Sequence, residues 1–271
     1  MSEQEQPAAV QAVPLSLLGR RALVTGTAGG IGGAIAQALV ARGAWVHGLD
    51  RDGQGQARLR TAVDALHPPG RFLPYQVDIA DPQALDGMLA ELAGTVLADG
   101  CDILVNAAGV SRTRKFEDSD DALLDSLFAV NFRAAFRITR ALVPMLKNSG
   151  RASVINVASE LALIGQPLYS AYSASKGAML SWTRALAVEL GRCGVRVNAV
   201  CPGPVDTAML AAEFEATESP LAARKAEIAT VPLGHLGAPA DIASVVAFLA
   251  SDEAAFVTGA VWPVDGGKTA A

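Results

Sequence analysis

The sequence predicts an α/β fold: a doubly wound, mostly parallel sheet of about seven strands with helices on both faces. Short apolar runs alternate with longer segments of helical apolar spacing along the whole chain. Of the 271 residues, 51% are hydrophobic and 5% aromatic. This composition suits strands that helices cover on both sides, and the length suits one large domain.

The first half of the chain contains three predicted strands. They cover residues 21–25, 45–50 and 72–77. Apolar residues recur at helical spacing over 30–42, and Gly43 provides a helix stop. A more polar helix follows the second strand and ends at the turn-forming segment 67–70.

The second half continues the same alternation. Its predicted elements, in order, are a helix at 82–97, a strand at 102–106, a long helix at 119–147 that contains Pro144, a strand at 153–157, a helix at 172–192, a strand at 196–201, a helix at 240–250 and a strand at 260–264. Because strands and helices alternate, the crossovers should be right-handed and the strands parallel.

One domain is expected over residues 17–271, since no linker or repeat interrupts it. Residues 1–16 are rich in Gln, Glu, Ala and Pro and are expected to form a mobile arm rather than a secretory signal. Residues 206–235 are polar, free of predicted strands and follow a strand end. Because ligands bind at such strand ends, this segment is expected to be a substrate lid.

Charge and residue counts exclude several classes of function. The chain has 22 Lys and Arg, 27 Asp and Glu and no basic block, so no nucleic-acid partner is expected. No apolar run reaches the roughly 18 residues of a membrane span. Cys101, Cys193 and Cys201 have no metal-ligand spacing, and the histidines are scattered. We therefore expect no metal, no disulfide framework and a cytoplasmic location.

A glycine-rich segment, TGTAGGIG at 25–32, connects the first strand to the first helix. Glycine lets the backbone approach a pyrophosphate closely, and the helix N-terminus offers free N–H groups. Alone, the segment is also typical of a tight turn. Asp50 ends the second strand and can accept hydrogen bonds from the adenosine ribose, although alone it is also typical of a turn or a helix cap. Together they predict a Rossmann dinucleotide site.

The same positions bear on the choice between NAD and NADP. The Asp50 carboxylate would repel a 2′-phosphate, and position 29 is Gly rather than a cationic residue. Arg51 is adjacent and can pair with that phosphate. NAD is therefore the expected cofactor, with NADP left open.

Tyr172 and Lys176 are four residues apart at the start of a predicted helix, so they share one face. Ser159 ends the preceding strand, and all three are expected at the carboxyl edge of the sheet. A phenol with an ordinary pKa near 10 is a poor base at neutral pH, but a nearby ammonium should lower that pKa. Tyr172 then becomes a usable acid/base catalyst.

These features together resemble the short-chain dehydrogenase/reductase family. The matching stretches are TGTAGGIG (25–32), VDIAD (77–81), NAAG (106–109), Asn131, Ser159, YSASK (172–176), CPGPVDT (201–207) and VTGAVWPVDGG (257–267). The resemblance extends from Leu17 to Lys268, and the order of the motifs agrees with the predicted elements.

The resemblance implies a role for each matching residue. Tyr172 transfers the proton, Lys176 lowers the pKa of Tyr172 and binds the nicotinamide ribose, and Ser159 hydrogen-bonds the substrate oxygen. Asn131 holds a water in a proton relay. The implied contacts to the adenosine half are Gly26, Ile31 and Asp50, with Gly29, Gly30, Gly32 and Arg51 from the same loops. Asp78 and Ile79 are the implied contacts to the adenine, and Asn106, Ala107 and Gly109 lie beside the cofactor. The implied contacts to the nicotinamide are Pro202, Gly203, Val205 and Thr207.

The implied reaction is reversible, NAD(P)-dependent oxidation of a secondary alcohol to a ketone by direct hydride transfer. The alternative is a Rossmann-fold nucleotide-sensing protein that binds cofactor without turnover, but such proteins typically lose the Tyr or the Lys. Enoyl reductases of related fold usually space these two residues differently, and epimerases and dehydratases usually have longer C-terminal domains.

The sequence leaves the substrate and the assembly open. Candidate substrate contacts are Ser111, Arg112, Glu160, Ala162 and Gln166, with apolar walls from Leu161, Leu163, Ile164 and Met209. Sugars, polyols, cyclic diols, steroids, acyl thioesters and small aromatic ketones all remain candidates. The resemblance also implies a homotetramer or homodimer built on helices 119–147 and 172–192. The apolar residues that favour it are Leu123, Leu127, Phe128, Met179, Leu180 and Trp182, although burial within the chain explains them equally well.

Overall fold

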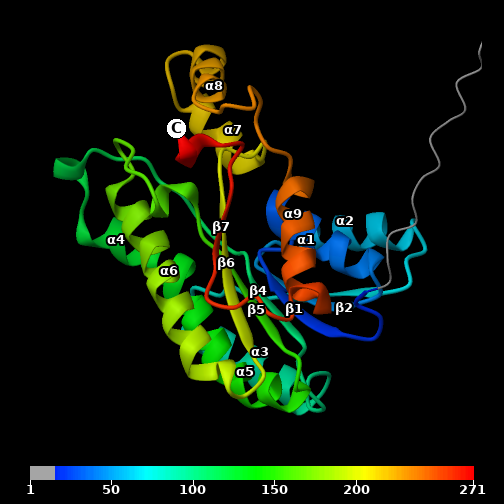
Figure 1. Ribbon diagram of the computed structural model, residues 1–271. Helices are drawn as coiled ribbons and strands as arrows, with labels where there is room; N and C mark the ends of the chain where they lie inside the picture. Colours follow the sequence, from blue (N-terminus) through cyan, green and yellow to red (C-terminus); the bar gives the residue numbers. More distant parts are fainter. Residues whose placement is uncertain (1–15) are drawn as a thin grey trace, which may run out of the picture.

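A computed structural model describes residues 16–271, so the predicted arm at 1–16 lies, apart from Ser16, outside the described residues. Seven strands form one parallel sheet in the order β3-β2-β1-β4-β5-β6-β7 (Figure 1). The strands are β1 (Arg21–Thr25), β2 (Trp45–Asp50), β3 (Arg71–Gln76), β4 (Ile103–Asn106), β5 (Ser153–Val157), β6 (Arg196–Pro202) and β7 (Val261–Val264). The predicted fold class is confirmed.

Helices cover both faces of the sheet (Figure 1). Helices α1, α2 and α9 pack on one face, and α3, α5 and α6 on the other, with α4 beside α6. Their bounds are α1 (Gly30–Ala41), α2 (Gly53–Asp64), α3 (Pro82–Gly94), α4 (Asp121–Phe128), α5 (Ala134–Ser149), α6 (Ser170–Gly191), α7 (Ala208–Glu215), α8 (Pro220–Ala229) and α9 (Pro239–Ala250).

Side-chain alternation along β1 explains why both faces need a cover. Ala22 and Val24 belong to the apolar cluster under α1 and α9, whereas Leu23 belongs to the cluster under α3 and α5. Successive residues of a strand point to opposite faces, so each strand contributes to two cores. All three side chains are fully buried.

The strand order reverses between β1 and β4, because the chain first adds β2 and β3 on one side and then crosses to the other. The loops that leave neighbouring β1 and β4 therefore diverge to opposite faces and leave a crevice at the carboxyl edge of the sheet. Helix α1 begins at this crevice with Gly29 as its N-cap, and no side chain caps it.

The predicted long helix at 119–147 is divided in two. A π-helical turn, Ala129–Arg133, separates α4 from α5. The interruption contains Asn131, whose side chain pairs with both backbone polar groups of Val110 in the loop after β4. A local π-turn is a common way to insert such a contact into a helix. Pro144 lies within α5 and does not end it.

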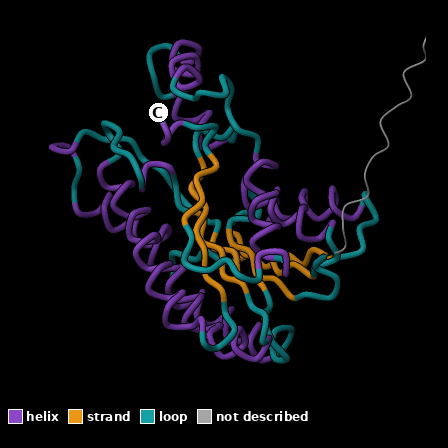
Figure 2. Tube along the Cα trace, viewed as in Figure 1, coloured by secondary structure: helices purple, strands orange, loops and turns teal. Residues whose placement is uncertain are grey.

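Residues 206–235 contain α7 and α8, which lie beyond the carboxyl ends of the strands (Figure 2). Thr207 caps α7 by accepting a hydrogen bond from the N–H of Leu210. Among residues 16–271, no helix combines the length and the apolar character needed to cross a bilayer.

Several apolar residues that were expected at subunit contacts are instead packed within this chain. Leu127, Met179 and Leu180 are buried within this chain. Trp182 packs edge-on against Phe132, with ring centres 5.6 Å apart, and it also contacts Phe136. Phe136 itself remains 42% exposed on α5.

Candidate active site

A cleft of about 550 Å³ lies along the carboxyl edge of the sheet. Loops that follow β1 to β6 line it, and α7 and α8 close one end. Asp50 and Asp78 line one end, and Ser159 and Tyr172 line the other. The cleft therefore joins the predicted nucleotide loop to the predicted catalytic residues.

Three glycines of the loop 25–32, Gly26, Gly30 and Gly32, leave no room for a side chain. A Cβ on Gly32 would collide with the carbonyl oxygen of Gly26. Gly26 itself has φ of +77°, and its Cβ would lie 2.8 Å from the Cα of Ala108. The first turn of α1 contains no acidic residue, so its N-terminal N–H groups face the cleft without a competing anion. This cradle fits the pyrophosphate of a dinucleotide.

Asp50 connects two loops at the end of the cleft where the adenosine is predicted to bind. Its carboxylate accepts hydrogen bonds from the backbone N–H of Ala28 and of Asp52, both at 2.9 Å. Each carboxylate oxygen can accept more than one hydrogen bond, so a ribose hydroxyl can still be bound. Arg51, Asp78 and Ile79 line the same end.

Tyr172 and Ser159 line the opposite end of the cleft, and Lys176 lies beneath it. Helix α6 begins at Ser170, two residues earlier than predicted, and carries Tyr172 and Lys176 in its first turns. The Nζ of Lys176 donates to the carbonyl of Val157 at 2.9 Å. It would lie 3.2 Å from a Cβ on Gly109, so the loop after β4 passes close to the ammonium at a residue that lines the cleft.

Burial dominates the acid–base properties of this pair. It raises the pKa of Tyr172 to about 12, while the Ser159 side chain acts in the opposite direction. Burial also lowers the pKa of Lys176 to about 8. Lys176 is not among the groups that shift the pKa of Tyr172 here, so the expectation that its ammonium lowers this pKa stays a prediction.

Two predicted asparagines serve the scaffold. Asn131 is buried, and its amide accepts from Val110 N at 2.8 Å and donates to Ser175 Oγ at 3.0 Å. Asn106 donates to Asn156 Oδ1 at 2.8 Å, so its side chain faces the core rather than the cleft. Neither side chain lines the cleft, although Ala107 and Gly109 do.

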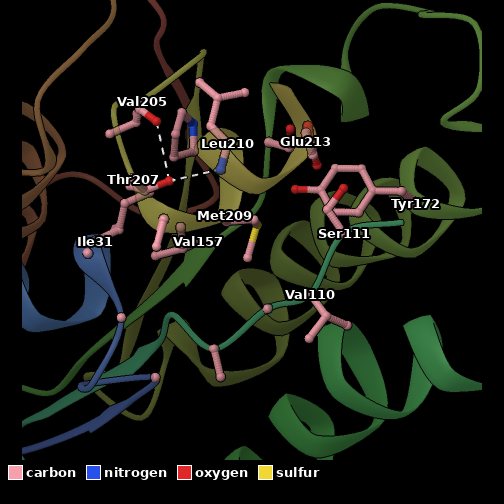
Figure 3. Close-up of a pocket in the computed structure, with 18 of the residues that line it drawn as sticks. Ile31, Val110, Ser111, Val157, Tyr172, Val205, Thr207, Met209, Leu210 and Glu213 are labelled. Carbon is pink, nitrogen blue, oxygen red and sulfur yellow. Dashed lines mark hydrogen bonds between the residues drawn. The ribbon is translucent and has the colours of Figure 1, made fainter. Parts of the chain in front are cut away.

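The loop after β6 forms the remaining wall. Pro202, Gly203, Val205 and Thr207 all line the cleft. The Thr207 hydroxyl donates to the carbonyl of Val205 and accepts from Leu210 N, which fixes the start of α7 (Figure 3). A Cβ on Gly30 would lie 2.9 Å from Thr207 Cγ2, so the glycine loop and this wall touch across the cleft.

The predicted substrate contacts divide into two groups. Those that line the cleft are Ser111, Glu160, Leu161, Gln166 and Met209. Those that do not line it are Arg112, Ala162, Leu163 and Ile164. The guanidinium of Arg112 instead donates to the carbonyl of Ser111 at 2.7 Å.

Several lining residues were not predicted. The hydroxyl of Tyr169 donates to Glu213 Oε2 at 2.7 Å, which joins the loop before α6 to α7. Met209 and Glu213 are four residues apart on one face of α7, and both line the cleft. Helical spacing within 206–235 could have revealed this face. No pattern in the sequence indicates that Glu227, on α8, lines the cleft.

A buried ion cluster lies beside Ser159. The Nζ of Lys268 contacts Glu160 Oε1 at 2.8 Å and Glu227 Oε1 at 2.7 Å. The turn after β7 places Lys268 there: Gly266 and Gly267 have positive φ. The cluster therefore connects the C-terminal segment, helix α8 and the residue next to Ser159.

With this geometry described, comparison with known proteins identifies the family. A family model described as Enoyl-(Acyl carrier protein) reductase matches residues 26–269. A levodione reductase structure superposes with a TM-score of 0.89 at 31% identity, covering 94% of this chain and 99% of that one. A structure described as a short chain dehydrogenase/reductase family protein has a TM-score of 0.82 at 34% identity, covering 94% and 100%.

The chain belongs to the short-chain dehydrogenase/reductase family. The 2-(S)-hydroxypropyl-CoM dehydrogenase 3 of Xanthobacter autotrophicus is 35% identical over 91% of this chain and 95% of its own length. The 3-oxoacyl-[acyl-carrier-protein] reductase FabG of Thermotoga maritima is 33% identical over 93% of this chain and 99% of its own length. As a member of this oxidoreductase family, the chain is related to dehydrogenases that act on CH–OH groups.

Replacing Gly32 with Ala tests the cradle. The added methyl group collides with the Gly26 carbonyl, so the loop must open and affinity for NADH should fall at least roughly tenfold. Gly87→Ala on α3 is the matched control, because a Cβ there meets nothing within 4 Å. Fluorescence titration with NADH measures both variants, and unchanged affinity in Gly32→Ala contradicts the assignment of the cradle.

Replacing Lys268 with Met tests the ion cluster. It leaves two carboxylates facing each other, so the free energy of unfolding should fall by about 3 kcal/mol, the low end for a broken buried pair because Glu227 is partly exposed. Lys225→Met, an exposed change on α8, should have little effect.

The pH dependence of Lys268→Met has a definite sign. Burial already raises the pKa of Glu160, and loss of Lys268 should raise it further. The folded variant then binds a proton more readily than the unfolded chain, so part of the lost stability returns as pH falls from about 8 to about 5. Denaturant unfolding across this range measures the effect, and a pH-independent loss contradicts it.

Proposed function

We propose that this protein is an NAD(P)-dependent oxidoreductase that interconverts a secondary alcohol and a ketone, with Tyr172 as the proton-transferring group. The single observation that carries the proposal is that Tyr172 and Ser159 line the same cleft as the glycine cradle. Lys176 lies beneath, held by the carbonyl of Val157. A bound nicotinamide would supply or accept the hydride.

The residues of the chain divide the remaining work. The Ser159 hydroxyl is placed to hydrogen-bond the substrate oxygen, and its own Oγ is oriented by the N–H of Leu161 at 3.1 Å. The Tyr172 hydroxyl lies in the same cleft and delivers or removes the proton at that oxygen. Apolar side chains, among them Leu161 and Phe214, line the same end of the cleft.

The buried phenol favours one role at neutral pH. With a pKa of about 12, Tyr172 is protonated and ready to donate to a ketone oxygen. Alcohol oxidation requires the opposite transfer, so its rate should rise with pH. Lys176, one turn further along α6, is the cation that we propose stabilises a phenolate formed during that step.

We further propose NAD as the preferred cofactor. The Asp50 carboxylate lines the adenosine end, and no cationic side chain occupies position 29. Arg51 lines the same end and supports some use of NADP. A protein from Beutenbergia cavernae that is described by assignment only as an NAD(P) dependent gluconate 5-dehydrogenase was solved with NADP bound at low occupancy. Its structure has a TM-score of 0.88 and 34% identity to this chain, covering 96% of this chain and 100% of that one.

The location and assembly of the protein are also proposals. Cysteines 101, 193 and 201 are free, which suits a reducing cytoplasm. A homotetramer or homodimer would cover the exposed Leu124 and Phe136 on α4 and α5.

Replacing Tyr172 with Phe tests the reaction. The ring is kept and the proton donor removed, so turnover should fall by roughly 10²–10⁴-fold while NADH affinity stays within a few-fold. A panel of secondary alcohols and ketones with NAD(H) and NADP(H), followed by absorbance of the reduced cofactor, provides the assay. Unchanged turnover in Tyr172→Phe refutes the mechanism. Cofactor binding by the parent protein without turnover on any member of the panel supports the nucleotide-sensing alternative.

Replacing Asp50 with Asn tests the cofactor preference. The neutral amide no longer repels a 2′-phosphate, so the ratio of kcat/KM for NADP over NAD should rise roughly tenfold, equivalent to about 1.4 kcal/mol. Asp64→Asn removes an equal charge from the exposed end of α2 and serves as the control. An unchanged ratio, or equal efficiency with both cofactors in the parent protein, removes the basis for the preference.

A further inference from the structure

The substrate end of the cleft is acidic. The charged residues that line it are Glu160, Glu213 and Glu227. Among the described residues that line the cleft, the one cationic side chain is Arg51, which lies at the adenosine end. A substrate that enters beside Tyr172 therefore meets carboxylates on α7 and α8 and no lining cation.

Internal partners compensate only part of this charge. Lys268 contacts both Glu160 and Glu227, so one ammonium serves two carboxylates. Glu213 accepts a hydrogen bond from the neutral Tyr169 hydroxyl and has no cation within salt-bridge distance among residues 16–271. By formal charge, this end of the cleft therefore has three carboxylates, Glu160, Glu213 and Glu227, for the one ammonium of Lys268.

Two buried polar atoms independently indicate a ligand at this end. Ser111 Oγ and Glu160 Oε2 find no hydrogen-bond partner among residues 16–271. Both residues line the cleft, and both are more than nine-tenths buried. Ser111 lies beside Tyr172, with Glu213 above them (Figure 3). Buried polar atoms in native proteins almost always have partners, so a bound group is expected to provide them.

The chemistry of these atoms defines that group. A carboxylate oxygen can only accept, and a serine hydroxyl can accept or donate. A ligand group with O–H or N–H donors satisfies both, whereas a carboxylate, phosphate or sulfonate offers no donor and is repelled by the surrounding charge. Leu161, Leu210 and Phe214 give the rest of this end an apolar wall.

We propose that the substrate is an uncharged or cationic ketone or alcohol whose second functional group is a hydrogen-bond donor, such as a hydroxyl, a primary amide or an ammonium, and that Glu213 rejects substrates with an anion at this position. This inference rests on the proposed function for the position of the reacting oxygen. It adds the class of substrate, which the family alone does not define.

Three matched ketones test the proposal: 4-oxocyclohexanecarboxamide, its methyl ester counterpart and 4-oxocyclohexanecarboxylate. They share a ring and differ in charge or in the donor. Their affinity for the protein saturated with NADH is measured by ligand-observed NMR, and their reduction by loss of NADH absorbance. The amide should bind at least roughly tenfold more tightly than the carboxylate, and more tightly than the ester.

Variants assign the effect to named side chains. Glu213→Gln keeps an acceptor for Tyr169 and removes the charge, so the preference for amide over carboxylate should shrink several-fold. Glu215→Gln, an equal change on the exposed face of α7, should leave it unaltered. Ser111→Ala should weaken the amide more than the ester, because both ligands offer a carbonyl to the Ser111 hydroxyl and only the amide also offers an N–H.

The outcomes separate this inference from the proposed function. Selective binding of the amide without reduction of any ketone contradicts the proposed function and leaves the substrate class standing. Equal or tighter binding of the carboxylate overturns the charge selection, as does an amide that fails to bind. A Glu213→Gln variant with the same preference as the parent removes Glu213 from the explanation.

Discussion

The desolvated ammonium of Lys176 is the constraint on which the catalytic end of the site depends. A lysine buried to this extent needs fixed acceptors, and the Val157 carbonyl at the end of β5 provides one at 2.9 Å. That contact fixes the first turns of α6 against the sheet edge and thereby places Tyr172 in the cleft. It also brings the ammonium close to Gly109, where an added Cβ would lie 3.2 Å from Nζ.

The parts of the fold and site that follow from local rules could be predicted from the sequence. Strand alternation, glycine turns and the four-residue spacing of Tyr172 and Lys176 depend on neighbours in the chain, and the seven strands appear within a residue or two of their expected bounds. The division of the long helix at Asn131 could not be predicted, because its partner is the backbone of Val110, which only the tertiary fold brings near. The direction of the Asn106 side chain could not be predicted for the same reason: its partner, Asn156, lies on the neighbouring strand.

The pKa values and ion pairs of the site were the hardest properties to predict from the sequence. A phenol four residues from a lysine suggests a lowered pKa when only the charges are considered. The folded chain buries both groups, and the desolvation of each opposes its ionisation. The sequence contains the charges, but the burial that determines their effect comes from α7, the β5–α6 segment and β6, which are assembled around Tyr172 only in the folded protein. The same holds for Lys268, whose two carboxylate partners lie 41 and 108 residues away.

The cleft therefore has two halves with different origins. Glycines and helix N-terminal N–H groups, together with the Asp50 carboxylate, build the proposed nucleotide half, which suits the parts that every dinucleotide shares. Side chains from α7, α8 and the C-terminal turn build the substrate half, and their contacts with the sheet are few compared with those of α1 or α6. Charge in that half can change without disturbing the cradle or the Lys176 contact. Because the nucleotide half and the substrate half are separate, the reaction can stay the same while the acidic residues of the substrate half determine which molecule binds. Here those residues are Glu213 and the cluster around Lys268.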